Sequence, residues 1–227
     1  CLTIARAHTG RRRVLTAKGA YHGSVPWCTP VREGVITEER AAIDHFPWND
    51  VDALEAAVQA VGDDLAAIVV SAFRHDAFTD QELPERAFAE RVRALCDRTG
   101  ALLILDEVRA GFRLHHDASW AALGVEPDLS AWGKVLANGH ALSAVLGSER
   151  ARAAAARIYV TGSFWCSAVP MAAARATLSE VQRLDVPAHV GRIGDRLRAG
   201  LAAQAERHGF GLRQTGPSQM PMVLFDD

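Results

Sequence analysis

Residues 101–147 read ALLILDEVRAGFRLHHDASWAALGVEPDLSAWGKVLANGHALSAVLG, and this stretch decides the fold. It opens with an apolar run at 101–105 that suits a strand buried on both faces. The run ends in Asp106, and a second short apolar run follows at 144–146. In open α/β sheets, functional groups gather where strands end in this way. We therefore expect Asp106 at the carboxyl end of a central strand.

The segment before this stretch completes a strand, helix and strand unit. Residues 66–70 form a run of five apolar residues. A helical stretch then repeats apolar residues at i, i+4, i+7 and i+8, and Gly100 follows it where a C-cap glycine belongs. The residues of this apolar face are Phe88, Val92, Leu95 and Cys96. The unit predicts an α/β fold with a mostly parallel central sheet flanked by helices.

Weaker patterns lie on either side of this unit. We expect further strands at 14–17 and 158–160, and long helices at 168–184 and 188–207. Pro187 separates the two helices, so we expect a hinge or domain boundary there. The chain opens on Cys1 and stops soon after the apolar PMVLF, so both ends suggest a fragment of a longer protein.

Bulk composition excludes several classes of protein. The 227 residues are 49% hydrophobic and 23% charged, which is ordinary for a globular chain. The net charge of −2 comes from interspersed acids and bases, so nucleic acid is not an expected partner. No apolar run is long enough to span a membrane, and no signal peptide is evident, so we expect a soluble cytoplasmic protein. The four cysteines form no C-x-x-C pair, and we expect no metal site.

Asp106 and Lys134 are the two residues whose setting indicates chemistry. A carboxylate directly after LLIL is partly desolvated and needs a cationic or hydrogen-bonding partner. Lys134 follows in PDLSAWGK, a mostly apolar context that makes its amine a Schiff-base candidate. Residue chemistry alone leaves two plainer interpretations open, a turn or cap residue for Asp106 and a solvated charge for Lys134.

Two other catalytic classes require motifs that this sequence lacks. LLILDE also matches the Walker B pattern of nucleotide hydrolases, but the chain has no G-x-x-x-x-G-K-[ST] loop, and valine follows Lys134. A serine hydrolase would need a G-x-S-x-G elbow, which is absent from the sequence. Neither class therefore finds its main motif here.

The order of the remaining motifs resembles a known family. D-E-V-x-x-G-F-R stands at 106–113, G-V-x-P-D-L at 124–129 and G-K at 133–134. Upstream lies a Y-H-G turn at 21–23, and downstream TGSFWCSAVPMAAARATL at 161–178. In this order the motifs resemble class III aminotransferases, most closely the branch that includes glutamate-1-semialdehyde aminomutase. The resemblance covers nearly the whole chain.

The resemblance implies the large domain of the fold-type I transferases of pyridoxal 5′-phosphate (PLP). It assigns residues 1–186 to that PLP-binding domain, lacking its amino-terminal part. It assigns residues 187–227 to a linker helix and the start of a truncated α+β small domain. It also implies a homodimer that takes a small-molecule amino donor and a carbonyl acceptor.

Residue roles follow from the same resemblance. Lys134 would bind the cofactor covalently as a Schiff base and move the substrate proton as general base and acid. Asp106 would pair with the protonated pyridine nitrogen, while Val108 and Tyr21, the latter in the turn with His22, would cover the two ring faces. Two further cofactor contacts are implied. Ser163 would reach the phosphate held by the neighbouring subunit, and Asp76 would lie near the phenolic oxygen.

The sequence departs from the family where substrate choice is made. The usual E-P-x-x-G-[EN]-x-G loop is replaced by SAFRHDAF at 71–78, and bulkier FWCS stands at 164–167. Arg74 and Arg109 are conceivable carboxylate clamps, although surface or structural roles are the plainer interpretation. We expect PLP-dependent amino-group transfer. The alternatives are an intramolecular aminomutase, a catalytically silent scaffold and the Walker B hydrolase.

Overall fold

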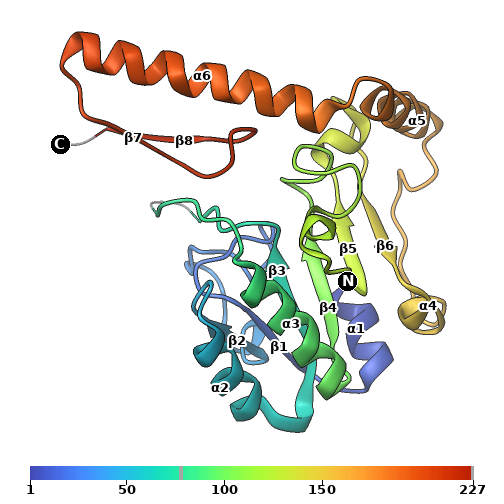
Figure 1. Ribbon diagram of the computed structural model, residues 1–227. Helices are drawn as coiled ribbons and strands as arrows, with labels where there is room; N and C mark the ends of the chain where they lie inside the picture. The colour runs from blue at the N-terminus through green and yellow to red at the C-terminus, as the bar shows by residue number, and fades with distance from the viewer. Residues whose placement is uncertain (77–78, 226–227) are drawn as a thin grey trace.

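The central element of the computed structural model, which describes residues 1–76 and 79–225, is a sheet of six strands (Figure 1). The strand order is β2-β1-β3-β4-β5-β6. The first five are mutually parallel and β6 is antiparallel to β5. The strands are β1 Arg13–Ala17, β2 Ile43–Phe46, β3 Leu65–Ser71, β4 Leu102–Asp106, β5 Leu129–Trp132 and β6 Ala144–Gly147. The expected mostly parallel sheet is confirmed.

Helices cover both faces of this sheet, because alternate residues of the central strands point to opposite sides. On one face, α2 (Val51–Val61) and α3 (Arg86–Thr99) pack on a core that includes Leu15, Ile68 and Leu103. On the other face, α1 (Leu2–Thr9) and α4 (Glu149–Ala155) pack on a second core. That core includes Val14, Val69 and Ile104.

Local sequence explains how α3 and α2 begin and end. The four apolar residues expected on one face of α3 are all buried. Gly100 ends α3 in the left-handed conformation, with φ 77°, which glycine adopts without a Cβ penalty. Asp50 begins α2, where its carboxylate accepts a hydrogen bond of 2.8 Å from the backbone amide of Ala53.

The carboxyl-terminal part of the chain adds two long helices and a hairpin. α5 spans Ala168–Arg183 and α6 spans Val186–His208, which confirms the two expected helices. The hairpin pairs β7 (Leu212–Thr215) with β8 (Met222–Phe225) in a separate sheet beside α6 (Figure 1). It touches the loop after β3, where the backbone amide of Gln81 donates to Thr215 at 2.9 Å. No helix among the described residues is long and apolar enough to cross a membrane.

The structure corrects two expectations. Residues 158–160 lie in an irregular segment after α4 and form no strand, and the Tyr159 side chain there is 90% exposed. Pro187 is not a break between helices, because it lies in the first turn of α6, where proline is tolerated. The chain turns instead at Asp185, which has φ 45°.

Candidate active site

The site forms where parallel strands end side by side. In the registers of β3, β4 and β5, Ser71 lies beside Asp106 and Asp106 lies beside Ala131. Lys134 follows two residues after β5 ends. The topology therefore brings Asp106 and the loop that carries Lys134 to neighbouring strand ends, as expected for an open α/β sheet.

Asp106 is largely buried, and both of its carboxylate oxygens have hydrogen-bond partners. The ring Nδ1 of His22 lies 2.8 Å from Oδ2, and the backbone amide of Val108 donates to Oδ1 at 3.0 Å. Burial is the largest single influence and raises the pKa of Asp106, but the hydrogen bond and charge of His22 together with the amide of Val108 outweigh it and hold the pKa below its usual value. The sequence-based expectation of a partner for this carboxylate is met.

His22 is fixed on three sides. Its side chain is only 3% exposed, and its second ring nitrogen, Nε2, lies 3.0 Å from the hydroxyl of Thr16. The ring stacks on Trp27, with centroids 6.0 Å apart and planes 14° from parallel. His22 was expected as part of a turn beside the cofactor, and the structure makes it the direct partner of Asp106.

Lys134 occupies a strained position at the start of a short 3-10 turn, Lys134–Ala137. Its φ is 46°, which is uncommon for a residue with a side chain. Such outliers concentrate at functional sites. The expected apolar surroundings are wrong in this structure, because the Lys134 side chain is exposed. It lines an open depression together with Arg113, Val135, Asn138, Gly139, His140 and Ala141.

Val108 connects the two parts of the site. Its amide binds Asp106. A Cβ placed on Gly133, the residue before Lys134, would meet the side chain of Val108 at 3.6 Å. The turn that follows β4 and the turn that carries Lys134 therefore pack against each other. This places Val108 between the carboxylate and the lysine segment.

Asp76 and Tyr21 lie on neighbouring loops. Asp76 is buried, and its carboxylate accepts a hydrogen bond of 3.3 Å from Nε of Arg74. Burial raises the pKa of Asp76, partly offset by the charges of Arg74 and His22. Tyr21 is 43% exposed, and its hydroxyl pairs with Ser24 at 3.1 Å. Ala77 and Phe78, which complete the altered loop, lie outside the described residues.

Ser163 lies apart from these groups on the segment between α4 and α5. Its side chain is exposed, as are those of Phe164 and Trp165. Ser163 is not the N-cap of α5, because that position belongs to Ser167. Within the described part of the chain, the structure brings together Asp106, His22, Val108 and Asp76, and it leaves Ser163 at the surface.

Glu107 is a site residue to which sequence reasoning gave no role. It is 1% exposed, and its two carboxylate oxygens accept hydrogen bonds from the amide and hydroxyl of Ser119, at 2.5 and 2.6 Å. Burial raises the pKa of Glu107 to about 7, with a smaller contribution from Asp106. A glutamate directly after a buried strand was the only signal in the sequence.

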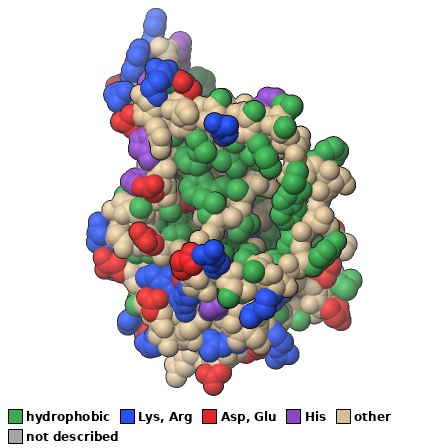
Figure 2. All heavy atoms as spheres, turned by 90° about the vertical axis from the view of Figure 1, so that its right-hand side faces the viewer, with side chains coloured by type: hydrophobic (Ala, Val, Ile, Leu, Met, Phe, Trp, Pro, Cys, Tyr) green, Lys and Arg blue, Asp and Glu red, His purple; other side chains and the backbone are tan. Residues whose placement is uncertain are grey.

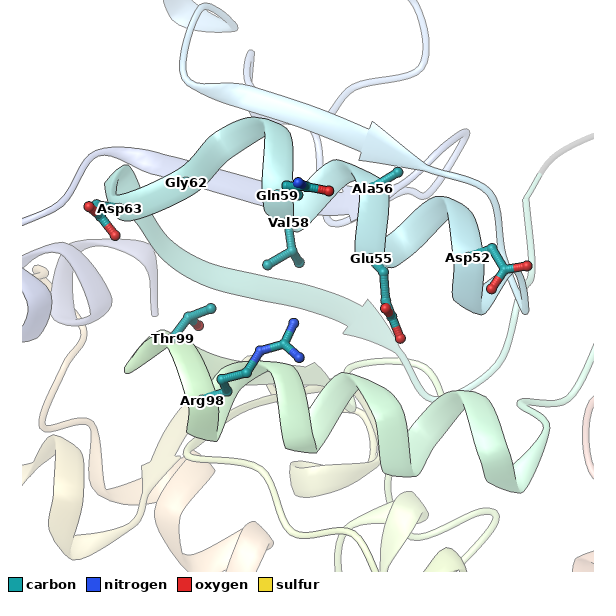
Figure 3. A pocket seen from close by; sticks show the side chains of 9 residues that line it. All are labelled: Asp52, Glu55, Ala56, Val58, Gln59, Gly62, Asp63, Arg98 and Thr99. Carbon is teal, nitrogen blue, oxygen red and sulfur yellow. The ribbon is translucent and has the colours of Figure 1, made fainter.

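A separate groove lies away from these residues. A groove of about 670 Å³ runs between α2 and α3, lined by acidic side chains and by Arg98 (Figure 3). Gly62 and Thr99 at its edge precede β3 and β4, so the groove lies at the amino ends of the strands. It contains none of the predicted site residues.

The donor set fits an aromatic cofactor with a protonated ring nitrogen. Asp106 is held as an anion inside an otherwise apolar strand end, and its remaining hydrogen-bonding capacity suits a cationic N–H. An amine with an exposed side chain, Lys134, lies on the adjacent turn. These groups can hold such a ring and attach a carbonyl carbon covalently.

Comparison with known proteins identifies relatives of the chain. The family model for class III aminotransferases matches residues 2–216. The aminopentol aminotransferase of Sphingopyxis macrogoltabida is 51% identical over all of this chain and 54% of its own length. A glutamate-1-semialdehyde 2,1-aminomutase of Shouchella clausii is 32% identical over 92% of the chain and 51% of its own length.

A solved structure agrees with these sequence relatives. It is described as the PLP internal aldimine form of the FumI protein of Sphingopyxis sp. MTA144. It superposes with a TM-score of 0.97 at 51% identity, over all of this chain and 55% of that one. The chain thus spans about half the length of the relatives it matches, which are 51–54% covered.

Proposed function

The chain belongs to the class III aminotransferase family, and on that premise we propose that the protein transfers an amino group between a small amine or amino acid and a keto or aldehyde acceptor, using PLP. The observation that carries the proposal is Asp106, a buried carboxylate kept anionic at a strand end beside the turn of Lys134. The 51% identity with an aminopentol aminotransferase supports an amine as the donor to test first.

PLP supplies an aldehyde carbon and a ring that accepts electrons. With PLP bound, Lys134 would hold that carbon through its Nζ and, once a substrate is bound, its amine would accept and return the substrate proton. The carboxylate of Asp106 would hold the ring nitrogen and favour its protonated form. Val108 and Tyr21 would cover the two ring faces, and Asp76 would lie toward the phenolic oxygen.

The assembly is part of the proposal. We assign residues 1–186 to the cofactor-binding domain and 187–227 to a linker helix and the start of the small domain. The separate β7–β8 sheet supports that division. We also propose a cytoplasmic homodimer in which Ser163 reaches the phosphate held by the neighbouring subunit. The four free thiols support the location, and the exposure of Ser163 leaves it accessible to a partner.

An apolar face supports the homodimer. Hydrophobic side chains gather around a hollow on the side of the molecule that Figure 2 presents. Exposed large apolar residues on β6 and on the segment between α4 and α5 include Val145, Leu146, Tyr159, Val160, Phe164 and Trp165. Exposed apolar side chains gathered in one region of a surface indicate a contact with another protein surface. We call it the apolar face 145–165.

The test of the function uses the complete, PLP-loaded protein with aminopentol or another amine and a keto acid. We expect one keto acid to be consumed for each amine, and no turnover with Lys134→Ala. Amine conversion without keto-acid consumption would favour the alternative, an aminomutase, which the 32% identity with a glutamate-1-semialdehyde aminomutase supports. If a broad panel of amines and keto acids gives no turnover, the proposal is wrong.

A further inference from the structure

His22, the hydrogen-bond partner of Asp106, also contacts Thr16 in the interior of the sheet. Thr16 lies on β1 with only 2% of its surface exposed. Its hydroxyl lies 3.0 Å from Nε2 of His22, whose Nδ1 lies 2.8 Å from Asp106. The three side chains come from β1, the turn after β1 and β4. They form a continuous line that starts in the core and ends at the cofactor-facing carboxylate.

An imidazole with one nitrogen on Asp106 has a second nitrogen that also needs a hydrogen-bond partner when it is buried. A hydroxyl can donate to this nitrogen or accept from it, so Thr16 satisfies Nε2 in either protonation state of the ring. Within the described residues, the Thr16 hydroxyl has no other hydrogen-bond partner. In the described part of the chain, the hydrogen bond of this hydroxyl is therefore with His22.

We propose that Thr16 is a positioning residue for the cofactor, and that it acts by holding His22 with Nδ1 directed at Asp106. Without the hydroxyl, the buried Nε2 loses its partner and the ring loses the contact that fixes its rotation. The bond between His22 and Asp106 then weakens. This inference rests on the proposed function, because the cofactor ring is the group that Asp106 meets.

The consequence for charge follows from the contacts of Asp106. The hydrogen bond with His22 is the strongest of the influences that lower the pKa of this buried carboxyl group. When that bond weakens, burial raises the pKa of Asp106, and the anion is lost at a higher pH. Other titratable groups also influence this pair, and the comparison below leaves all of them unchanged. Cys28, His75 and Glu107 interact with Asp106 through their charges. Asp76 interacts in the same way with His22.

The experiment measures the dissociation constant of PLP for the complete protein across pH, by equilibrium dialysis, in the parent, Thr16→Val and Thr16→Ser. Valine keeps the shape of threonine without the hydroxyl, and serine keeps the hydroxyl. We expect Thr16→Val to weaken PLP binding by about tenfold, the effect of one lost hydrogen bond to a buried group. The acid limb of its pH profile should move to higher pH, because the pKa of Asp106 rises when the bond with His22 weakens. Thr16→Ser should stay within about twofold of the parent.

Thr99→Val is the matched control, because the Thr99 hydroxyl also makes a hydrogen bond, to the carbonyl of Leu95 at 2.8 Å, but at the end of α3. It should leave PLP binding unchanged. Our inference is wrong if Thr16→Val follows the parent at every pH, if Thr16→Ser is as weak as Thr16→Val, or if Thr99→Val has the same effect. A parent protein that binds no PLP would instead overturn the proposed function itself.

Discussion

Asp106 and Glu107 are adjacent carboxyl groups with opposite pKa shifts, and their hydrogen-bond partners explain the difference. The imidazole of His22 and the amide of Val108 favour the charged form of Asp106 enough to overcome burial. Glu107 has the neutral donors of Ser119, and burial dominates, so its pKa rises to about 7. The sequence predicted that Asp106 needs a partner. It could not identify His22, because the two residues are 84 positions apart and meet only through the sheet.

Glu107 should make folding stability depend on pH. Its folded-state pKa of about 7 lies above the ordinary 4.5, so Glu107 keeps its proton up to a higher pH in the folded state than in the unfolded state. Its contribution to stability is therefore present at low pH and is lost as pH rises from about 4.5 to 7.

Glu107→Gln removes this dependence. As pH rises from about 4.5 to 7, we expect the unfolding free energy of the parent to fall relative to that of the variant by up to about 3 kcal/mol. Urea denaturation at a series of pH values measures both free energies. Glu90→Gln on the exposed side of α3 is the control and should show no such window. A difference that stays constant with pH would contradict the pKa shift of Glu107.

At the scale of elements, the sequence predicts the strands and helices that have a regular hydrophobic pattern and misses those with a mixed pattern. β3, buried along its whole length, and α3, with one apolar face, follow from the sequence. β2 alternates irregularly between buried and exposed residues, and its short run IDHF carries no clear strand signal. The expected strand at 158–160 was wrong, because these residues form an irregular segment after α4 and belong to neither sheet of the described structure. Strand pairing depends on the tertiary fold, which a local pattern does not contain.

Two glycines of α6 make a matched test of how this helix packs on the hairpin. A Cβ built at Gly194 would overlap the backbone carbonyl of Ser218, whereas nothing lies within 4 Å of one built at Gly200. We expect Gly194→Ala to destabilise the protein by about 1–3 kcal/mol through overpacking. Gly200→Ala should stabilise it by up to about 1 kcal/mol through helix propensity. Thermal unfolding measures both, and equal shifts in the two variants would contradict the close packing of α6 at Ser218.

At the scale of the whole molecule, the unexpected feature is how much apolar surface is exposed. The sequence has bulky residues at 164–167, directly after Ser163, and the structure leaves Phe164 with 87% of its surface exposed. Exposure of the apolar face 145–165 to water is unfavourable unless another protein surface covers it. Sequence patterns could not outline the face, because its residues come from β6 and from an irregular segment.

Phe164→Asp tests whether the apolar face 145–165 is the subunit interface. A charge placed there should weaken the homodimer about tenfold or more, because it removes an aromatic contact and buries a carboxylate. Sedimentation equilibrium of the complete protein measures the dissociation constant. Phe210→Asp, at a side chain 64% exposed between α6 and β7, is the control and should leave the dimer unchanged. If both variants dimerise like the parent, the interface lies elsewhere.

Covalent attachment of PLP to Lys134 is the central claim, and reductive trapping tests it most directly. The complete protein is incubated with PLP, reduced with borohydride, digested, and analysed by mass spectrometry. We expect a single stable PLP adduct on the peptide that carries Lys134, and a visible absorption band before reduction. Lys134→Ala should show neither. An unmodified Lys134 peptide in the parent, or an adduct found only on Lys18, the other lysine of this chain, would contradict the account.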